Sequence, residues 1–126
     1  MTIAQVLQRV DDLKPNQLSA EQKIEWLSQL DRKYFEEIIK THEKDQGTPD
    51  SFAGYENETD QNTMLLIQDP YSEVYQWYLY MQIDLANQEM DKYNNSLALY
   101  ETAWGANARR YNREHMPIQR AKTWKF

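Results

Sequence analysis

Histidine side chains can support catalysis or metal binding, and this sequence contains two of them. The two histidines, His42 and His115, do not occur in a spacing such as His-Glu-x-x-His, which would place two ligands on one helix face. Each lies near the end of a helical pattern, where an imidazole complements the negative end of the helix dipole. We therefore expect both histidines to be structural and predict no metal site around them.

The acidic residues form no better catalytic pair. Glu36 and Glu37 are adjacent, so on a helix their side chains point in different directions, whereas acid–base chemistry needs two carboxylates that face one substrate. The segment from Asp45 to Asp50 lacks the alternating oxygen ligands and the final Glu of an EF-hand loop. With three glycines and no cysteine, the chain also lacks phosphate-binding loops, nucleophile elbows and thiolate sites. We expect no catalytic residue, no cofactor and no metal.

Charge is divided unevenly along the chain, whose formal net charge is -6. Of its 20 acidic residues only Glu101 and Glu114 follow residue 100, whereas six of its 14 basic residues do. An acidic body with a basic end is typical of proteins whose tail binds an acidic partner surface or nucleic acid. The six basic residues are Arg109, Arg110, Arg113, Arg120, Lys122 and Lys125.

The composition predicts one folded domain in a reducing environment. Four Trp, nine Tyr and three Phe are enough to build a core at this length. No apolar run approaches the roughly 20 residues of a membrane span, and the first residues do not resemble a signal peptide. Together with the lack of cysteine, these features favour an intracellular protein without a membrane segment.

Apolar residues at steps of three and four predict two helices in the first third of the chain. The first covers residues 3–13, with Thr2 as its N-cap. The second begins after Ser19, which is expected to form a capping box with Gln22, and extends until Gly47 ends the pattern.

Two further helices are predicted to form the centre of the fold. Asp69 and Pro70 favour a helix start, because Asp can cap the first amides and Pro needs no partner at the first position. The segment 71–86 is apolar or aromatic around most of its circumference, which indicates a central helix. A tight turn at 87–89 must separate it from the helix 90–114, since a single helix would be too long for this domain.

The segment 47–68 between these helix pairs has the composition of a loop. It is rich in acidic residues and contains Gly47, Pro49 and Gly54, which favour turns. Within it, 52–55 and 64–67 are short apolar patches that could pair as a small β-hairpin.

These elements predict an all-α fold, a small four-helix bundle with a long central helical hairpin. Residues 1–116 form the helical domain and 117–126 a short basic tail. A helix of 25 residues is about 37 Å long, so the last turns of the helix 90–114 should project beyond the body. They carry Arg109, Arg110 and Arg113.

Aromatic and amide-rich motifs along the chain also carry a family resemblance. They are TIAQVLQRVDDLKPN at 2–16, FAGY at 52–55, DPYSEVY at 69–75, YL at 78–79, Asp84, Asn87, Glu89, YNNS at 93–96 and YNREHMP at 111–117. With these motifs the sequence resembles, over nearly its whole length, the head–tail connector proteins of tailed phages and prophages. These proteins are also called adaptors or head-completion proteins.

The resemblance implies a non-enzymatic structural protein of phage assembly, a compact helical bundle that forms a ring below the portal. It implies as partners the portal protein and neighbouring copies of the same chain, with a tail-completion protein as a further candidate. It places the chain in the host cytoplasm during assembly and at the head–tail junction of the virion. DNA would pass through the ring without specific binding, and an acidic body suits this passage because it repels phosphate.

The residues expected at protein interfaces are the patch in the loop and the basic end of the chain. They are Phe52, Tyr55, Arg109, Arg110, Arg113, Ile118, Arg120, Lys122, Trp124, Lys125 and Phe126. Two alternatives remain open, another prophage structural or tail-completion protein, and a regulatory protein that binds nucleic acid through its basic end.

Overall fold

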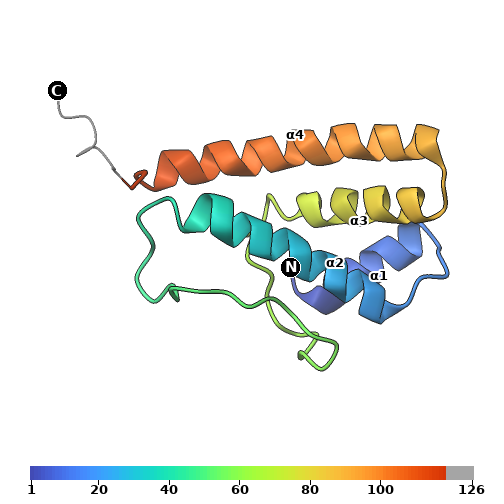
Figure 1. The fold of residues 1–126 in the computed structure, drawn as a ribbon, viewed down its shortest axis with the longest axis horizontal. Coiled ribbons are helices and arrows are strands. Elements are labelled where there is room, and N and C mark those ends of the chain that lie inside the picture. Colours follow the sequence, from blue (N-terminus) through green and yellow to red (C-terminus); the bar gives the residue numbers. More distant parts are fainter. Residues whose placement is uncertain (119–126) are drawn as a thin grey trace.

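The computed structural model describes residues 1–118 of the chain, and over this part the fold is all-α. Its helices are α1 (Ile3–Leu13), α2 (Ala20–Tyr34), α3 (Glu73–Ala86) and α4 (Met90–Glu114), and α2 continues directly into the short π-helix η1 (Phe35–Ile39). Residues 40–72, which we call the connection, link η1 to α3 without a helix or strand (Figure 1). The predicted existence of all four helices is confirmed.

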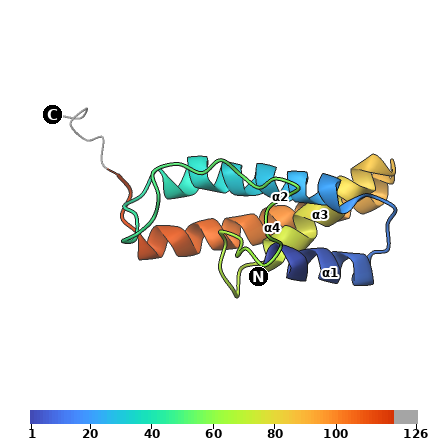
Figure 2. The ribbon, with the colours of Figure 1, turned by 90° about the horizontal axis from the view of Figure 1, so that it is seen from below.

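The helices α3 and α4 form an antiparallel hairpin, which is the central helix pair of the bundle (Figure 1). Seen from below, α2 and α1 lie along opposite edges of the view, with α3 and α4 visible between them (Figure 2). The C-terminal half of α4 lies along the end of α2, where the ring of Tyr34 packs edge-on against Trp104 and Tyr111, with centroids 6.1 and 6.0 Å apart. The last turns of α4 therefore do not project freely, which corrects the sequence prediction.

Thr2 and Ser19 are the N-caps of α1 and α2 as predicted, but the capping box expected between Ser19 and Gln22 is found instead between Thr2 and Gln5. Thr2 accepts from the amide of Gln5 at 3.1 Å while the Gln5 side chain accepts from the Thr2 amide at 2.9 Å. The hydroxyl of Ser19 accepts from the Gln22 amide at 3.1 Å. These side chains satisfy amides that the first helical turn leaves without partners.

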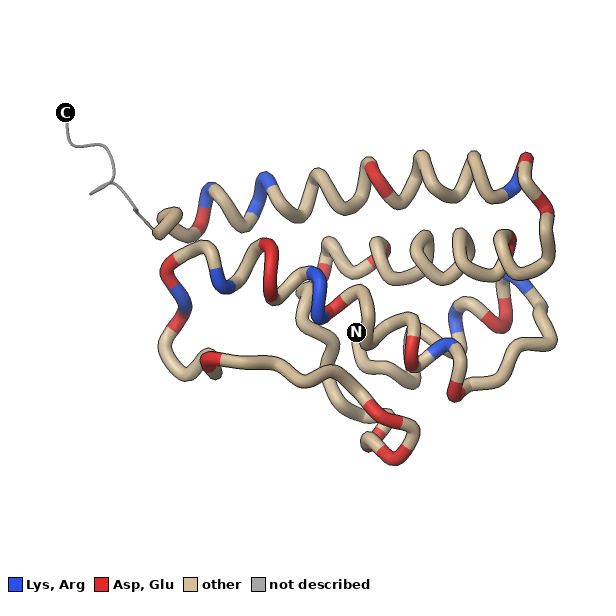
Figure 3. Tube along the Cα trace, viewed as in Figure 1, with Lys and Arg blue, Asp and Glu red and all other residues tan. Residues whose placement is uncertain are grey.

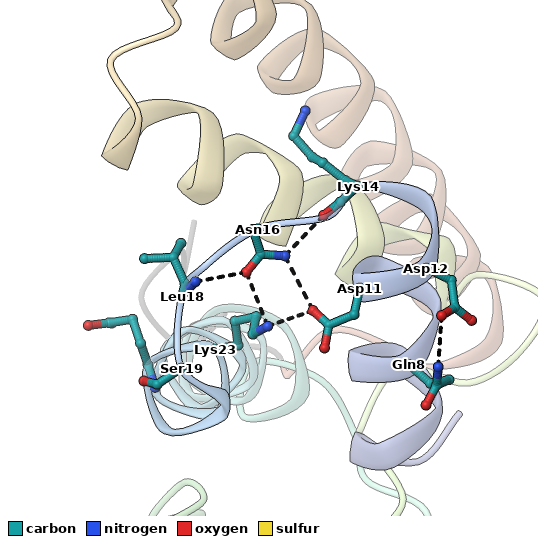
Figure 4. Close-up of polar contacts among 9 residues, drawn as sticks. Gln8, Asp11, Asp12, Lys14, Asn16, Leu18, Ser19 and Lys23 are labelled. Carbon is teal, nitrogen blue, oxygen red and sulfur yellow. Dashed lines mark hydrogen bonds and ion pairs between the residues drawn. The ribbon is translucent and has the colours of Figure 1, made fainter.

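The link between α1 and α2 is held by a buried lysine (Figure 4). The ammonium of Lys23 lies 2.6 Å from a carboxylate oxygen of Asp11 and 3.2 Å from the amide oxygen of Asn16. The Asn16 side chain also bonds the backbone at Lys14 and Leu18. A single cluster thus fixes the angle at which the chain turns from α1 into α2.

The helical segment that begins with α2 ends at Ile39, before the predicted stop at Gly47. The hydroxyl of Thr41 donates to the carbonyl groups of Glu37 and Ile38, both at 3.0 Å. These bonds satisfy carbonyls that would otherwise accept from the next helical turn. The helix thus ends near Thr41, before the glycine is reached.

The start of α3 also differs from the prediction. The helix begins at Glu73 with Ser72 as N-cap, and residues 69–72 form a turn. The carboxylate of Asp69 accepts from the hydroxyl of Ser72 and does not cap the first amides of a helix at Pro70. The carboxylate is thus engaged within the turn, which explains why Asp69 and Pro70 do not start the helix.

The predicted turn between α3 and α4 is confirmed at Asn87 to Glu89. Gln88 has a positive φ of 58°, its amide donates to Leu85 O at 3.0 Å, and the amide of Glu89 donates to Asp84 O at 2.9 Å. This pair of bonds is the Schellman motif, in which glycine usually occupies the left-handed position.

The expected β-hairpin of 52–55 with 64–67 is not seen, because the described part of the connection contains no strand. Met64 instead forms an isolated bridge with Thr2, and the amides of Ile3 and Ala4 donate to Thr63 O and Gln61 O at 3.1 and 2.8 Å. The start of α1 therefore pairs with the backbone at and just before Met64, and not with the segment 52–55.

Candidate protein-interaction site

The patch Phe52 to Tyr55 packs against its own helices. Tyr55 is buried and Phe52 is half-buried, with the Phe52 ring centroid 6.1 Å from that of Phe35 and 5.2 Å from that of Tyr55. Tyr55, which was predicted for an interface, is therefore packed within its own chain. Phe52 presents only part of its ring to solvent.

The patch is held in place by Asp31, whose side chain is completely buried. Its carboxylate accepts hydrogen bonds from the hydroxyl of Tyr55, from the hydroxyl of Tyr75 at 2.6 Å and from the amide of Leu66 at 3.1 Å. The Tyr75 hydroxyl in turn accepts from the amide of Ile67 at 2.7 Å. One carboxylate thus joins α2, α3 and two separate points of the connection.

Burial raises the pKa of Asp31 from 3.8 to about 6, although the hydrogen bonds from Tyr55, Tyr75 and Leu66 act in the opposite direction. Desolvation dominates because the donors are neutral and none of the ion pairs in residues 1–118 involves Asp31. Burial, followed by the charge of Asp31, also raises the pKa of both tyrosines, so their hydroxyl groups keep their protons.

Gly54 allows the connection to approach α2 at this point. The hydroxyl oxygen of Ser28 accepts from the Tyr55 amide at 2.9 Å, and a Cβ atom at position 54 would overlap that oxygen. Gly54 also has a φ of +98°, which side chains rarely adopt. A glycine is therefore required by both space and backbone conformation.

A second buried carboxylate, Asp84, lies where α1, α3 and α4 meet. One of its oxygens is 2.7 Å from the ammonium of Lys14, and the other accepts from the hydroxyl of Ser96 at 2.9 Å. The contact with Lys14 is a close ion pair that lacks the alignment of a hydrogen bond. Asp84 is as deeply buried as Asp31 but has a cationic partner.

Arg110, expected at an exposed interface, is 8% exposed and belongs to the interior of the α4 end. Its guanidinium donates to Asn107 at 2.6 Å and to Glu114 at 3.1 Å, and it lies over the ring of Tyr71, 5.1 Å from the centroid. Its positive charge is thus already paired. Arg109 and Arg113 are exposed, as predicted.

Both histidines lie around Tyr111 at the same end of the molecule. The ring of His115 stacks on Tyr111 with centroids 3.8 Å apart, and that of His42 meets it edge-on at 5.3 Å. His42 reaches Asn112 of α4 at 2.5 Å, whereas His115 reaches Asp45 of the connection at 3.0 Å. His42 thus bonds the connection to α4, and His115, which follows α4, bonds that end of the chain to the connection. Holding these segments together is a structural role.

A cavity of about 230 Å³ opens beside these residues. Its wall includes Tyr34, Tyr111 and the buried Arg110, whose Nε has no hydrogen-bond partner, and its rim includes Asp45 and Glu114. The two rim carboxylates would repel an anion that approached the guanidinium. Among residues 1–118, no group of three or more His, Asp or Glu side chains could hold a metal ion.

The exposed apolar side chains of this end belong to the first residues after α4. The amide of Glu43 donates to Met116 O at 2.7 Å, and the amide of Ile118 donates to Thr41 O at 2.8 Å. The side chains of Met116 and Ile118 nevertheless remain 61% and 47% exposed. We call residues 116–118 the tail root, because they fix the point from which the tail continues.

Of the residues predicted for interfaces, Arg109 and Arg113 are exposed on the last turns of α4 and Ile118 is exposed in the tail root. Phe52 lies elsewhere, on the connection against η1. The remaining residues of the prediction lie outside the described part of the chain. They are Arg120, Lys122, Trp124, Lys125 and Phe126.

The burial of Asp31 and Asp84 was not predicted from the sequence. The available signal was periodicity, since Asp31 follows Leu27 by four residues and precedes Tyr34 by three, within the apolar stripe of α2. Asp84 likewise lies between the buried Met81 and Ile83 and the turn after α3.

None of the helices in residues 1–118 is long and apolar enough to cross a membrane. Comparisons of the chain with protein-family models, with curated proteins and with solved structures found no match.

Proposed function

We propose that this chain is a non-enzymatic structural protein of phage or prophage head–tail assembly, a four-helix bundle that forms a ring-type adaptor between portal and tail. The proposal is supported by the resemblance that extends over nearly the whole sequence. The structural observation that carries it is the tail root, where Met116 and Ile118 expose apolar side chains although their backbone is anchored. Such an arrangement suits a segment that binds another chain.

The chemistry of the partner surface follows from the charges near the tail root. Arg109 and Arg113 are exposed on α4, and the tail sequence adds three further basic residues. A basic segment with apolar side chains favours an acidic surface that carries apolar pockets. In the proposed adaptor this surface belongs to the portal protein, and neighbouring copies meet at the sides of the bundle.

The acidic connection supports the passage of DNA without binding. Seven acidic residues and one basic residue occur between positions 43 and 69, and Figure 3 shows acidic residues along this segment. Carboxylates repel the phosphates of DNA, so a ring lined by such segments would not retain DNA.

Cryo-electron microscopy of the protein mixed with the portal protein of the same genome tests the proposal. We expect additional ring density on the portal, and its loss when Arg120, Lys122 and Lys125 are all replaced by Glu. The matched control replaces Arg9, Lys40 and Lys92, which are distant from the tail in sequence, by Glu and should keep the ring. Portal particles without additional density would refute the adaptor role, and binding to tail components alone would favour a tail-completion protein.

The exposed Arg109 and Arg113 support a second candidate function, the binding of nucleic acid. This candidate requires an affinity that falls steeply with salt, because each phosphate contact releases counterions. A gel-shift titration at low salt should show binding that Arg109→Gln with Arg113→Gln weakens. A flat titration would exclude this candidate.

A further inference from the structure

Asp31 is a buried carboxylate that has no cationic partner among residues 1–118, and it is placed where the connection is fixed to the helices. The hydrogen bonds from the Tyr55 hydroxyl and the Leu66 amide come from two points of the connection that are separated by ten residues of chain. Both bonds end on the same carboxylate. The connection therefore cannot leave the helices without exposing Asp31 to water.

Ionisation of Asp31 affects two states of the connection differently. In the closed state residues 52–67 pack on the helices, and in the open state they have left the helices. In the closed state the ionised carboxylate lacks the hydration that water provides, and three hydrogen bonds from neutral donors replace it only in part. In the open state water solvates the ionised form fully. Ionisation therefore favours opening, and protonation favours closure.

We infer that Asp31 is a proton-sensitive latch of the connection: its protonated form holds residues 52–67 on the helices, and its ionisation lets this segment open locally. The groups that face Asp31 support this direction. They are Tyr55 of the connection, Tyr75 of α3 and Tyr34 of α2 itself, while Arg110 of α4 acts on Tyr34. None of the three tyrosines supplies a positive charge that would stabilise the ionised carboxylate.

Local opening would release the side chains that the sequence analysis assigned to an interface. Tyr55 is buried while the latch is closed, and Phe52 is half-buried against Phe35. Opening exposes both aromatic rings together with the amides of Leu66 and Ile67. That these groups then bind a neighbouring copy rests on the proposed function, whereas the latch itself is a property of the single chain.

Amide hydrogen exchange measured by NMR on the isolated full-length protein tests the latch. The reporters are the amides of Tyr55, Leu66 and Ile67, whose acceptors are Ser28, Asp31 and the Tyr75 hydroxyl. Exchange rates are divided by those of unstructured peptides of the same sequence at the same pH, which gives the opening equilibrium. Amides of the α3–α4 hairpin serve as the internal reference for global unfolding.

The pKa of Asp31, raised by burial from 3.8 to about 6, sets the size of the expected effect. Opening at the reporter amides should increase on the order of fiftyfold between pH 4 and pH 7.5. The reference amides should rise by a similar factor, because global unfolding also exposes Asp31, but their opening equilibrium should stay well below that of the reporters at both pH values. Equal opening of the reporters at the two pH values, or reporters that open no more readily than the reference amides, would overturn the inference.

Two variants separate Asp31 from other acidic groups. Asp31→Asn should abolish the pH dependence at the reporters, whereas Asp84→Asn should leave it unchanged because Asp84 lies at another junction. Tyr75→Phe removes one donor from the ionised carboxylate and should make the pH dependence steeper at Tyr55 and Leu66. A pH dependence that persists in Asp31→Asn contradicts the latch, and the wild-type titration decides the question if that variant does not fold. Neither result bears on portal binding, so the latch and the proposed function can fail separately.

Discussion

Asp31 and Asp84, the two fully buried carboxylates of the part of the chain that the structure describes, are held in different ways. Asp84 joins α1, α3 and α4 and is paired with the ammonium of Lys14 at 2.7 Å. Asp31 joins α2, α3 and the connection and receives only neutral donors. The junction at Asp84 is thus compensated in charge, whereas the junction at Asp31 keeps an electrostatic penalty at neutral pH.

This difference shows how one fold can combine a junction whose stability changes little with pH and a segment whose stability depends on pH. Hydrogen bonds alone satisfy the geometry of a buried carboxylate but do not replace the free energy of its hydration. A cationic partner restores part of that free energy, so ionisation of the carboxylate no longer favours opening of the junction. We therefore expect the α1–α3–α4 junction to be the less pH-sensitive of the two.

The largest expected effect comes from removing the cation of the compensated site. Lys14→Met should lower the free energy of unfolding at pH 7 by about 3–4 kcal/mol, because it leaves the Asp84 carboxylate buried without a cationic partner. Urea unfolding measures the change. The double variant Lys14→Met with Asp84→Asn is the control and should regain most of the loss. If the single variant is as stable as the wild type, the ion pair does not distinguish the two junctions.

The second effect is the pH dependence of the uncompensated site. Because folding raises the pKa of Asp31 from 3.8 to about 6, its contribution to stability is complete below pH 3.8 and is lost as the pH rises through 6. The loss corresponds to about 3 kcal/mol. Urea unfolding of the wild type and of Asp31→Asn from pH 4 to pH 7.5 should show this difference between the two proteins, and parallel pH profiles would contradict it.

A steric change at the Asp31 junction should have the next largest effect. Gly54→Ala combines an unfavourable φ of +98° with an overlap at Ser28 Oγ and should lower stability by about 2 kcal/mol. Gly47→Ala is the matched control, because Gly47 has a φ of +87° but no atom near the added Cβ. Thermal unfolding should therefore show a smaller decrease for Gly47→Ala. Equal decreases would mean that the contact with Ser28 is unimportant.

The smallest effect is expected next to Asp84, whose carbonyl accepts from Glu89 in the turn after α3. Gln88→Gly should raise stability by up to about 1 kcal/mol, because glycine adopts the positive φ of this position without strain. The melting temperature should increase by a few degrees, on the order expected for a domain of this size. A decrease would indicate that the Gln88 side chain itself stabilises the turn.

Much of the fold was predictable because helix periodicity and caps are local signals. The start of α1 at Thr2 and that of α2 at Ser19 follow from side chains that bond their own first turn. The turn at 87–89 was predictable from helix length although its left-handed residue is Gln88. Such features depend on neighbouring residues alone.

The candidate site was less predictable because it depends on contacts between distant segments. The side chain of Arg110 was expected to be exposed, but Asn107, Glu114 and the ring of Tyr71 surround it in the fold. Polarity alone likewise gives no indication that Asp31 is buried, since the same residue on the opposite face of α2 would be solvated. Sequence reasoning therefore located the exposed cations Arg109 and Arg113 but not the polar interior.

The tail root has a mechanical consequence. Because the amide of Ile118 donates to Thr41 and Met116 accepts from Glu43, tension on the tail is transmitted to residues 41–43 as well as along α4. The load is thus shared between two helices, since residues 41–43 follow directly on η1. A particle that pulls on this protein through its tail would strain the start of the connection, at residues 41–43, before it unwinds α4.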